Sequence, residues 1–207
     1  MIFPPMAAEE DASQLSSLLD RVRRSVKMSA TTIPPEDDRS KLLTAAVCMI
    51  LKPADSRNSL EILLLRRRSS EGDPWSGQIA FPGGRSKPGE APLDTVRREV
   101  VEESRINLEH SEVLGPLAEV FPGNFSIGVL PFVAVVPHDT KVKIDNNEID
   151  DFFWIPASYF LDRNNSSIYS FSRQGRKIEV PSFVYMGKYV IWGMTLRIIE
   201  NFLSSLN

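Results

Sequence analysis

The sequence predicts a single domain that mixes α-helices with β-strands, of the α/β or α+β class. Its 207 residues are 42% hydrophobic and 25% charged, which is enough for one core and long for two. Short apolar runs typical of strands are interspersed with segments of helical periodicity. There is no internal repeat and no regular βαβ alternation, so periodicity alone does not choose between the two classes.

The N-terminal part of the chain predicts one amphipathic helix followed by a linker. Over residues 9–28 one stripe is apolar, and it consists of Leu15, Leu18, Leu19, Val22 and Val26. The simplest role of this stripe is packing against the core or a partner. Residues 31–40 contain Pro34-Pro35 and read as a linker. We therefore expect residues 1–40 to form a helix and linker, and residues 41–207 to form the globular domain.

Strands and a closing helix are predicted for the remainder. We expect strands at 42–51, 60–65, 113–120 and 129–136, and a short apolar strand within 147–156. The segment 66–82 reads as a loop because it is rich in glycine, proline and polar residues. An excursion with a hairpin is expected at 162–177. Residues 189–206 read as a strand end that runs into an amphipathic helix from about Met194.

The most informative stretch is an acidic helix expected over residues 91–104. Its glutamates Glu99, Glu102 and Glu103 stand at i, i+3 and i+4, so they project from one face and can converge on one point. Like charges at this spacing repel, and a divalent cation would relieve the repulsion. Oxygen ligands without nearby cysteine or histidine favour Mg²⁺ or Mn²⁺ over zinc. The alternative is a solvated helix face with salt bridges to Arg97 and Arg98.

The spacing of the whole stretch resembles the Nudix hydrolases. Five residues separate Gly84 from Glu90, seven separate Glu90 from Arg98-Glu99, and Glu102-Glu103 follow two residues later. The resemblance implies a Nudix-type α/β/α sandwich with a mixed β-sheet, to which the N-terminal helix is an addition. It also implies metal-dependent hydrolysis of a nucleoside diphosphate derivative. One departure is Arg105, which stands where the family has a glycine at the helix C-terminus.

The resemblance and the carboxylate spacing together nominate the catalytic residues. We expect Glu99 and Glu103 to bind the metal, with Glu102 assisting and a backbone carbonyl near Gly83 completing the shell. Either Glu102 or Glu148 would take the proton of the attacking water. By resemblance, Arg98 would orient a glutamate and Glu90 would fix the loop.

Two further segments resemble coenzyme A diphosphatases. The first comprises Leu64-Leu65, Arg68-Ser69 and residues 77–84, and the second is residues 189–195. They imply coenzyme A or its thioesters as substrate, with 3′,5′-ADP and 4′-phosphopantetheine or acyl-phosphopantetheine as products. The segment departs from the family pattern at Arg66, which replaces a threonine, and at Gly72-Asp73, which replaces a Leu-Arg pair.

Substrate-binding residues are expected in the loops beside the acidic helix. Arginine forks match phosphate oxygens, which nominates Arg66, Arg67 and Arg68, although strand alternation should leave at least one of them in solvent. Ser69 and Gln78 belong to the same loop. In the turn 121–125, Phe125 could place its ring against a base, or serve the core or a lid.

Composition excludes several other classes. A net charge of −3 argues against a nucleic-acid surface. Cys48 lies in an apolar run and reads as a buried thiol, and two histidines in turn-like surroundings do not suggest a zinc site. Neither a signal sequence nor an apolar run of eighteen residues is present, so we expect no membrane partner and a cytoplasmic protein.

Three questions stay open at this level. An enzyme that acts on another Nudix substrate, such as ADP-ribose, NADH or an oxidised nucleotide, would have the same residues at every position of the Nudix pattern. A non-catalytic nucleotide-binding module is the alternative from another class. A monomer and a homodimer are both compatible with the sequence.

Overall fold

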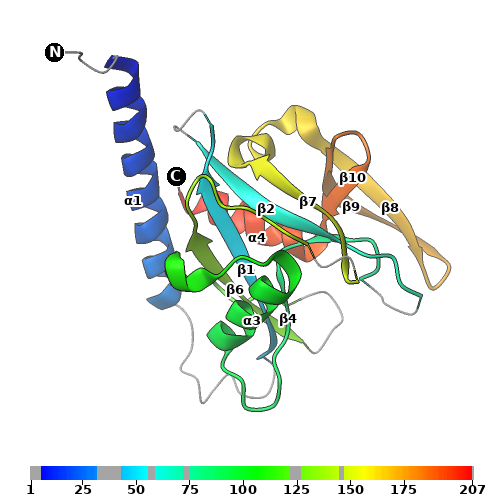
Figure 1. The fold of residues 1–207 in the computed structure, drawn as a ribbon. Coiled ribbons are helices and arrows are strands. Elements are labelled where there is room, and N and C mark those ends of the chain that lie inside the picture. Colours follow the sequence, from blue (N-terminus) through cyan, green and yellow to red (C-terminus); the bar gives the residue numbers. More distant parts are fainter. Residues whose placement is uncertain are drawn as a thin grey trace.

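A computed structural model describes residues 6–31, 43–55, 59–71, 75–121, 127–144 and 147–206 (Figure 1). The helices are α1 (Met6–Thr31), α3 (Pro92–Ser104) and α4 (Gly193–Ser204), with short 3-10 turns at Leu108–His110, Ala157–Phe160 and Arg163–Asn165. The strands are β1 (Leu43–Pro53), β2 (Leu60–Arg67), β3 (Ile79–Ala80), β4 (Gly83–Arg85), β5 (Glu112–Pro116), β6 (Gly128–Val135), β7 (Ile149–Pro156), β8 (Ser166–Arg173), β9 (Arg176–Tyr185) and β10 (Tyr189–Trp192).

The main sheet is mixed and has seven strands. Its order is β3-β2-β1-β6-β5, with β4 paired to β1 and β7 paired to β2. The β1–β6 pair is parallel, while the other pairs are antiparallel. Helix α3 covers one face of this sheet, and α1 and α4 cover the other. The predicted sandwich of a mixed sheet between helices, with an extra N-terminal helix, is confirmed.

Strand β1 shows why its sequence is apolar without interruption. Its residues alternate between two separate cores: Ala46, Cys48 and Ile50 pack on the α3 side, whereas Met49 and Leu51 pack on the α1 and α4 side. A strand covered on both faces needs apolar side chains at every position. Each fully buried Leu or Ile contributes roughly 1.5–3 kcal/mol. The predicted burial of Cys48 is confirmed, because its side chain is fully buried.

A second sheet of three antiparallel strands, β10-β9-β8, follows β7 in the chain. It lies at the opposite end of the molecule from α1 (Figure 1). Phe183 and Ile191 on one of its faces belong to the core beneath α4. The small sheet is thereby anchored to the main body, and its other face is available for a different role.

Helix α1 is packed onto the domain through its C-terminal half. Val22 and Val26 are fully buried, and Arg23 donates two hydrogen bonds of 2.8 Å to the carboxylate of Glu112 on β5. The apolar stripe therefore faces the core, as the simplest reading of it predicts. In the part of the chain that the structure describes, none of the helices combines the length and the apolar character needed to span a bilayer.

Several element boundaries differ from the prediction. Arg66 and Arg67 end strand β2, and Ile79–Ala80 pairs with that strand, so segment 66–82 is not all loop. The strand expected at 113–120 stops at Pro116, with a register shift between Val113 and Gly115. The predicted hairpin is present, but its second strand continues to Tyr185. Most of the expected linker, residues 32–40, lies outside the described residues.

Candidate active site

Two glycines bring strand β4 close to its neighbours. Gly83 has φ of 149°, and a Cβ there would lie 2.4 Å from the carbonyl oxygen of Ala46 on β1. A Cβ on Gly84 would lie 2.5 Å from Oε1 of Glu99. Only residues without a side chain permit both contacts. The backbone of β4 therefore lies directly against the carboxylate of Glu99.

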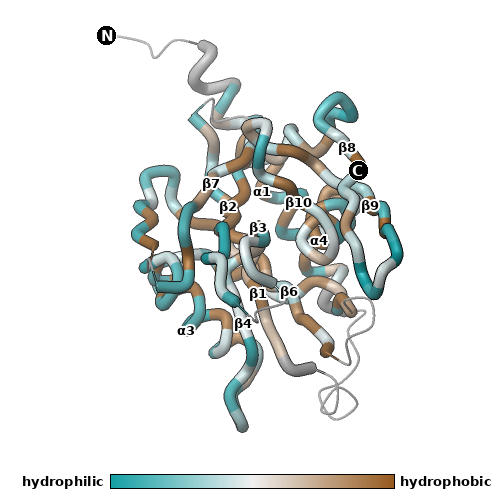
Figure 2. The backbone as a smooth tube through the Cα atoms, turned by 90° about the vertical axis from the view of Figure 1, so that its right-hand side faces the viewer, coloured by the Kyte–Doolittle hydropathy of each residue, from teal (hydrophilic) through white to brown (hydrophobic). Residues whose placement is uncertain are grey.

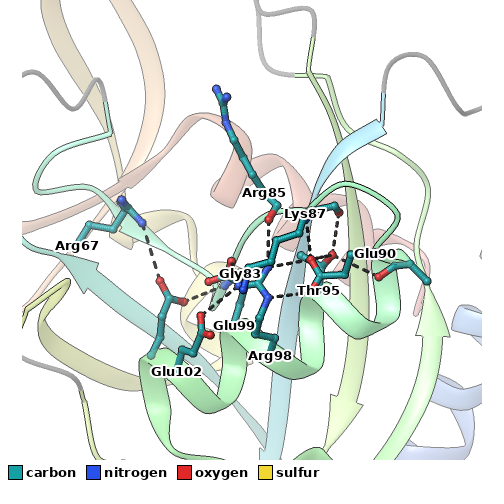
Figure 3. Close-up of polar contacts among 12 residues, drawn as sticks. Arg67, Gly83, Arg85, Lys87, Glu90, Thr95, Arg98, Glu99 and Glu102 are labelled. Atoms are coloured by element: carbon teal, nitrogen blue, oxygen red, sulfur yellow. Dashed lines mark hydrogen bonds and ion pairs between the residues drawn. The ribbon is translucent and has the colours of Figure 1, made fainter.

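Arg98 connects three carboxylates around the start and middle of α3 (Figure 3). Its Nε donates to Glu90 Oε1 at 2.8 Å, and its Nη1 donates to Glu99 Oε1 at 2.7 Å and to Glu102 Oε2 at 3.1 Å. The hydrogen bonds that Glu90 accepts from Arg98 lower its pKa to about 2, and those from the Lys87 N–H and the Thr95 hydroxyl contribute smaller effects. The pKa of Arg98 is raised, chiefly by its hydrogen bonds with Glu90. Arg98 thus fixes the loop to the helix and holds Glu99 in place.

Glu103 is the buried member of the acidic group. Its side chain is 4% exposed, and its Oε2 accepts a hydrogen bond of 2.9 Å from the backbone N–H of Gly83. Burial raises the pKa of Glu103 to about 8, and the negative charges of Glu99 and Glu148 add to this effect. The nearest cation is Arg67, whose Nη1 lies 3.9 Å from Glu103 Oε1. Binding of a cation beside Glu103 would offset the cost of burying its negative charge, so this carboxylate is suited to be a metal ligand.

The three glutamates do not converge on one point in this structure. Arg98 holds Glu99 and Glu102, Glu103 turns to Gly83 and Arg67, and Glu102 remains 54% exposed. Among the residues that are described, no three His, Cys, Asp or Glu side chains form a ready metal site. The predicted convergence of the three carboxylates is therefore not met, because each carboxylate instead forms a hydrogen bond or an ion pair with an arginine or a backbone N–H.

The donor set nevertheless fits a divalent cation. Glu99, Glu103 and Glu148 are close enough for their charges to raise one pKa, and all three supply oxygen ligands of the kind that Mg²⁺ and Mn²⁺ prefer. Glu99 and Glu103 both lie against β4, at Gly84 and Gly83 respectively. The ligand roles of these residues stay predictions.

A cleft of about 1630 Å³ lies between the main sheet and the three-stranded sheet. Figure 2 shows α3 to one side of β3 and β9 to the other. Of the residues predicted to bind substrate or metal, Gly83, Glu103, Arg66, Arg67 and Gln78 line this cleft. It is larger than the sites of most small ligands, so it has room for an extended substrate.

Other predicted substrate-binding residues lie elsewhere. Arg68 and Ser69 are exposed and do not line the cleft. The backbone N–H of Arg68 donates to the carbonyl of Glu148, which precedes β7, and its Nε lies 3.9 Å from Asp150 on β7. Strand β2 ends before these two residues, and their substrate-binding roles stay predictions. Phe125 lies outside the described residues.

The sequence nominated Arg66 for the cleft but not Lys188, a second cation that lines it. Arg66 and Lys188 lie 5.9 Å and 4.6 Å from the ring centre of Tyr189, whose hydroxyl donates to Asp151 at 3.0 Å. Arg66, Lys188 and Tyr189 all line the cleft. The position of Tyr189 between Arg66 and Lys188 depends on the pairing of β10 with β9 and on the approach of β2, neither of which is visible in a linear sequence.

Residues from 77–84 and from 189–195, on which the expectation of coenzyme A rests, meet in this cleft. The buried hydroxyl of Thr195, in the first turn of α4, donates a hydrogen bond of 3.0 Å to the carbonyl of Ile79 on β3. Both residues line the cleft. Residues 116 positions apart therefore form one wall.

Comparison with known proteins gives consistent results. A family model for the NUDIX domain matches residues 42–174. The "Uncharacterized Nudix hydrolase NudL" of Photorhabdus laumondii subsp. laumondii is 32% identical over 172 residues, covering 81% of this chain and 87% of that protein. The protein of the same name from Yersinia pestis (strain Pestoides F) is 34% identical over 142 residues, covering 67% of this chain and 69% of that protein.

A solved structure agrees at the level of the fold. The protein DR0079 from Deinococcus radiodurans superposes with a TM-score of 0.51 at 15% identity, covering 77% of this chain and 82% of that one. The region matched by the family model contains Gly83, Gly84 and every carboxylate held by Arg98. The chain belongs to the Nudix family of pyrophosphohydrolases, enzymes that hydrolyse the diphosphate bond of nucleoside diphosphate derivatives.

Proposed function

We propose that this enzyme hydrolyses coenzyme A or its thioesters, giving 3′,5′-ADP and 4′-phosphopantetheine or its acyl form. The observation that carries the proposal is the hydrogen bond between Thr195 and Ile79. It joins the two segments that resemble coenzyme A diphosphatases into one wall of the cleft that also contains Glu103. A substrate held by both segments would therefore lie beside the acidic helix.

The charges of the cleft support binding of a diphosphate. Arg66 and Lys188 lie near the ring of Tyr189, Arg67 lies 3.9 Å from Glu103, and all three cations line the cleft. The N-terminus of α4, which favours negative charge, also opens on the cleft. Arg66 and Arg67 would bind phosphate oxygens, and Gln78 would orient the substrate by hydrogen bonds.

The carboxylates divide the remaining tasks. Glu99 and Glu103, assisted by Glu102 and the Gly83 carbonyl, would hold Mg²⁺ or Mn²⁺. Such an ion, when bound, offsets the charge of the diphosphate and lowers the pKa of a water molecule. Glu102 and Glu148 are exposed, and either can accept a proton and pass it to solvent. Arg98 is a positioning residue, because it holds Glu99 and ties α3 to Glu90.

A substrate panel tests the proposal. Purified enzyme would be incubated with Mg²⁺ or Mn²⁺ and with coenzyme A, octanoyl-coenzyme A, ADP-ribose, NADH or an oxidised nucleotide, and the products separated by chromatography. We expect the highest kcat/KM for coenzyme A or its thioester, with 3′,5′-ADP as product. Faster turnover of ADP-ribose, NADH or the oxidised nucleotide would reject coenzyme A as the substrate and leave the diphosphate chemistry intact.

A further inference from the structure

The three-stranded sheet presents an aromatic face to the cleft. Tyr169 and Phe171 on β8 are paired with Val180 and Ile178 on β9, so these four side chains share one face. Trp192 on β10 is opposite Ser182, two residues beyond Val180, and therefore belongs to the same face. All of these residues except Ser182 line the cleft. We call Tyr169, Phe171, Trp192, Ile178 and Val180 the aromatic wall.

The rings of the wall contact one another rather than standing apart. Trp192 lies 5.0 Å from both Tyr169 and Phe171, and these two are 5.8 Å apart between ring centres. None of the three is fully buried, Ile178 and Val180 lie beside them on the wall, and Arg173 continues the same face of β8 at the hairpin end. The wall supplies few polar atoms, essentially the Tyr169 hydroxyl and the Trp192 indole N–H. It is an apolar surface inside a cleft whose other lining residues include the charged side chains of Arg66, Arg67 and Glu103.

We propose that the aromatic wall binds an apolar chain at the end of the substrate, such as the acyl group of a coenzyme A thioester. This assignment rests on the proposed function, because it takes the wall as the far end of the cleft that holds the diphosphate. Arg66 and Lys188 line the same cleft and would hold phosphate. A substrate with phosphates at one end and an alkyl chain at the other matches this distribution of charge.

The geometry favours an alkyl chain over a nucleobase held between rings. Carbon atoms in contact are about 3.5–4.0 Å apart, so a base between two rings needs them separated by roughly 7–8 Å. The ring centres here are 5.0 and 5.8 Å apart, which leaves no such slot. An alkyl chain needs only an apolar surface, and each methylene buried on it should tighten binding about fourfold.

Binding without turnover tests the wall directly. In EDTA, calorimetry would compare coenzyme A with its butyryl and octanoyl thioesters for the wild-type enzyme, Phe171→Ala and Ile168→Ala. Ile168 is a matched control because it lies on the other face of β8 and is 61% exposed. We expect affinity to rise at least tenfold from coenzyme A to the octanoyl thioester in the wild type and in Ile168→Ala. In Phe171→Ala this gain should fall by fivefold or more, with unchanged affinity for coenzyme A.

A second ligand series separates this inference from the substrate assignment. Butyl and octyl phosphate contain only an alkyl chain and a phosphate, so they report on the wall without coenzyme A. Tighter binding of octyl than butyl phosphate in the wild type and Ile168→Ala, lost in Phe171→Ala, supports the wall even if no coenzyme A compound is hydrolysed. Equal affinities within both series in the wild type, or a gain that Phe171→Ala retains, would overturn the inference. A gain that appears instead with nucleobase-containing fragments and depends on Phe171 would assign the wall to a base.

Discussion

Glu103 is a carboxylate whose burial, at 4% exposure, is unfavourable without a cation nearby. Its pKa of about 8 lies above the ordinary value of 4.5 for a glutamate, so the folded protein keeps a proton that the unfolded chain loses. Without metal, the stabilisation from this proton is complete below pH 4.5 and is lost as pH rises to about 8. Stability in EDTA should therefore fall across this range.

The variant Glu103→Gln should remove that pH dependence. Glutamine keeps the shape and an acceptor for the Gly83 N–H but carries no charge, so at pH 8.5 in EDTA it should be more stable by on the order of a few kcal/mol. With Mg²⁺, kcat should fall by roughly two to three orders of magnitude. Urea unfolding at pH 5 and 8.5 and steady-state assays would measure both effects. Exposed Glu109→Gln is the control, and an active Glu103→Gln enzyme would refute the metal-ligand role.

Arg105 ends α3 in the left-handed conformation, with φ of 58° and ψ of 18°. The Nudix pattern has glycine at this position, where a positive φ carries no steric cost. A side chain in this conformation costs roughly 1 kcal/mol, so Arg105→Gly should stabilise the fold by about 0.5–1 kcal/mol, as judged by urea unfolding. Arg105→Ala retains the strain and should not stabilise. Equal effects of both variants would show that the contacts of the arginine side chain dominate.

For individual residues, the spacing predicted which side chains lie near one another, but it did not predict what each one contacts. The i, i+3, i+4 pattern predicted that Glu99 and Glu103 project from one face of the helix, and both lie against β4, at Gly84 and Gly83 respectively. The resemblance implied that Arg98 orients a glutamate, but spacing did not say which one, because the Arg98–Glu99 pair depends on the rotamers of both side chains. The sequence also did not show that Glu103 is buried. Glu102, the adjacent residue of the same type, is exposed, so residue type alone does not distinguish the two positions.

The junction between β4 and α3 depends on the absence of a side chain at Gly84. In Gly84→Ala the new Cβ would meet Glu99 Oε1 at 2.5 Å, and the flexible carboxylate would move away. We expect a loss of tenfold or more in kcat/KM with a small change in stability. Gly89→Ala is the matched control: its φ is 77° and a Cβ there would have nothing within 4 Å. It should lose about 1 kcal/mol of stability and retain activity. The reverse pattern would show that Gly84 serves the fold and not Glu99.

Elements were predictable where the pattern was long and strictly periodic. The two-sided apolar run of β1 and the stripes of α3 and α4 were found close to their observed bounds. The two-residue strand β3 was missed, because so short a pairing leaves no periodic signal and depends on the tertiary approach of β2. Pro116 ends β5 early, although the apolar residues continue beyond it.

At the scale of the whole molecule, the cleft could not have been predicted. Its walls come from β2, β3, β4, α3, the three-stranded sheet and α4, which are joined by long-range pairings such as that of Thr195 with Ile79. Composition and spacing predicted the layers, since each layer is built from a local pattern. The position of the small sheet depends on Phe183 and Ile191, whose sequence neighbourhood resembles any other apolar strand.

Helix α1 extends the core beyond the region matched by the family model, which begins at residue 42. Val22 and Val26 are fully buried, Arg23 is paired with Glu112, and Arg21 donates to the carbonyl of Leu206. Val26→Asp would bury an unpaired charge, so we expect a loss of roughly 3 kcal/mol or more in the free energy of unfolding. Exposed Lys27→Ala, on the same helix, should change it by less than about 0.5 kcal/mol. Guanidinium unfolding followed by circular dichroism would measure both. If Val26→Asp unfolds at the wild-type midpoint, α1 is an appendage that the core does not need.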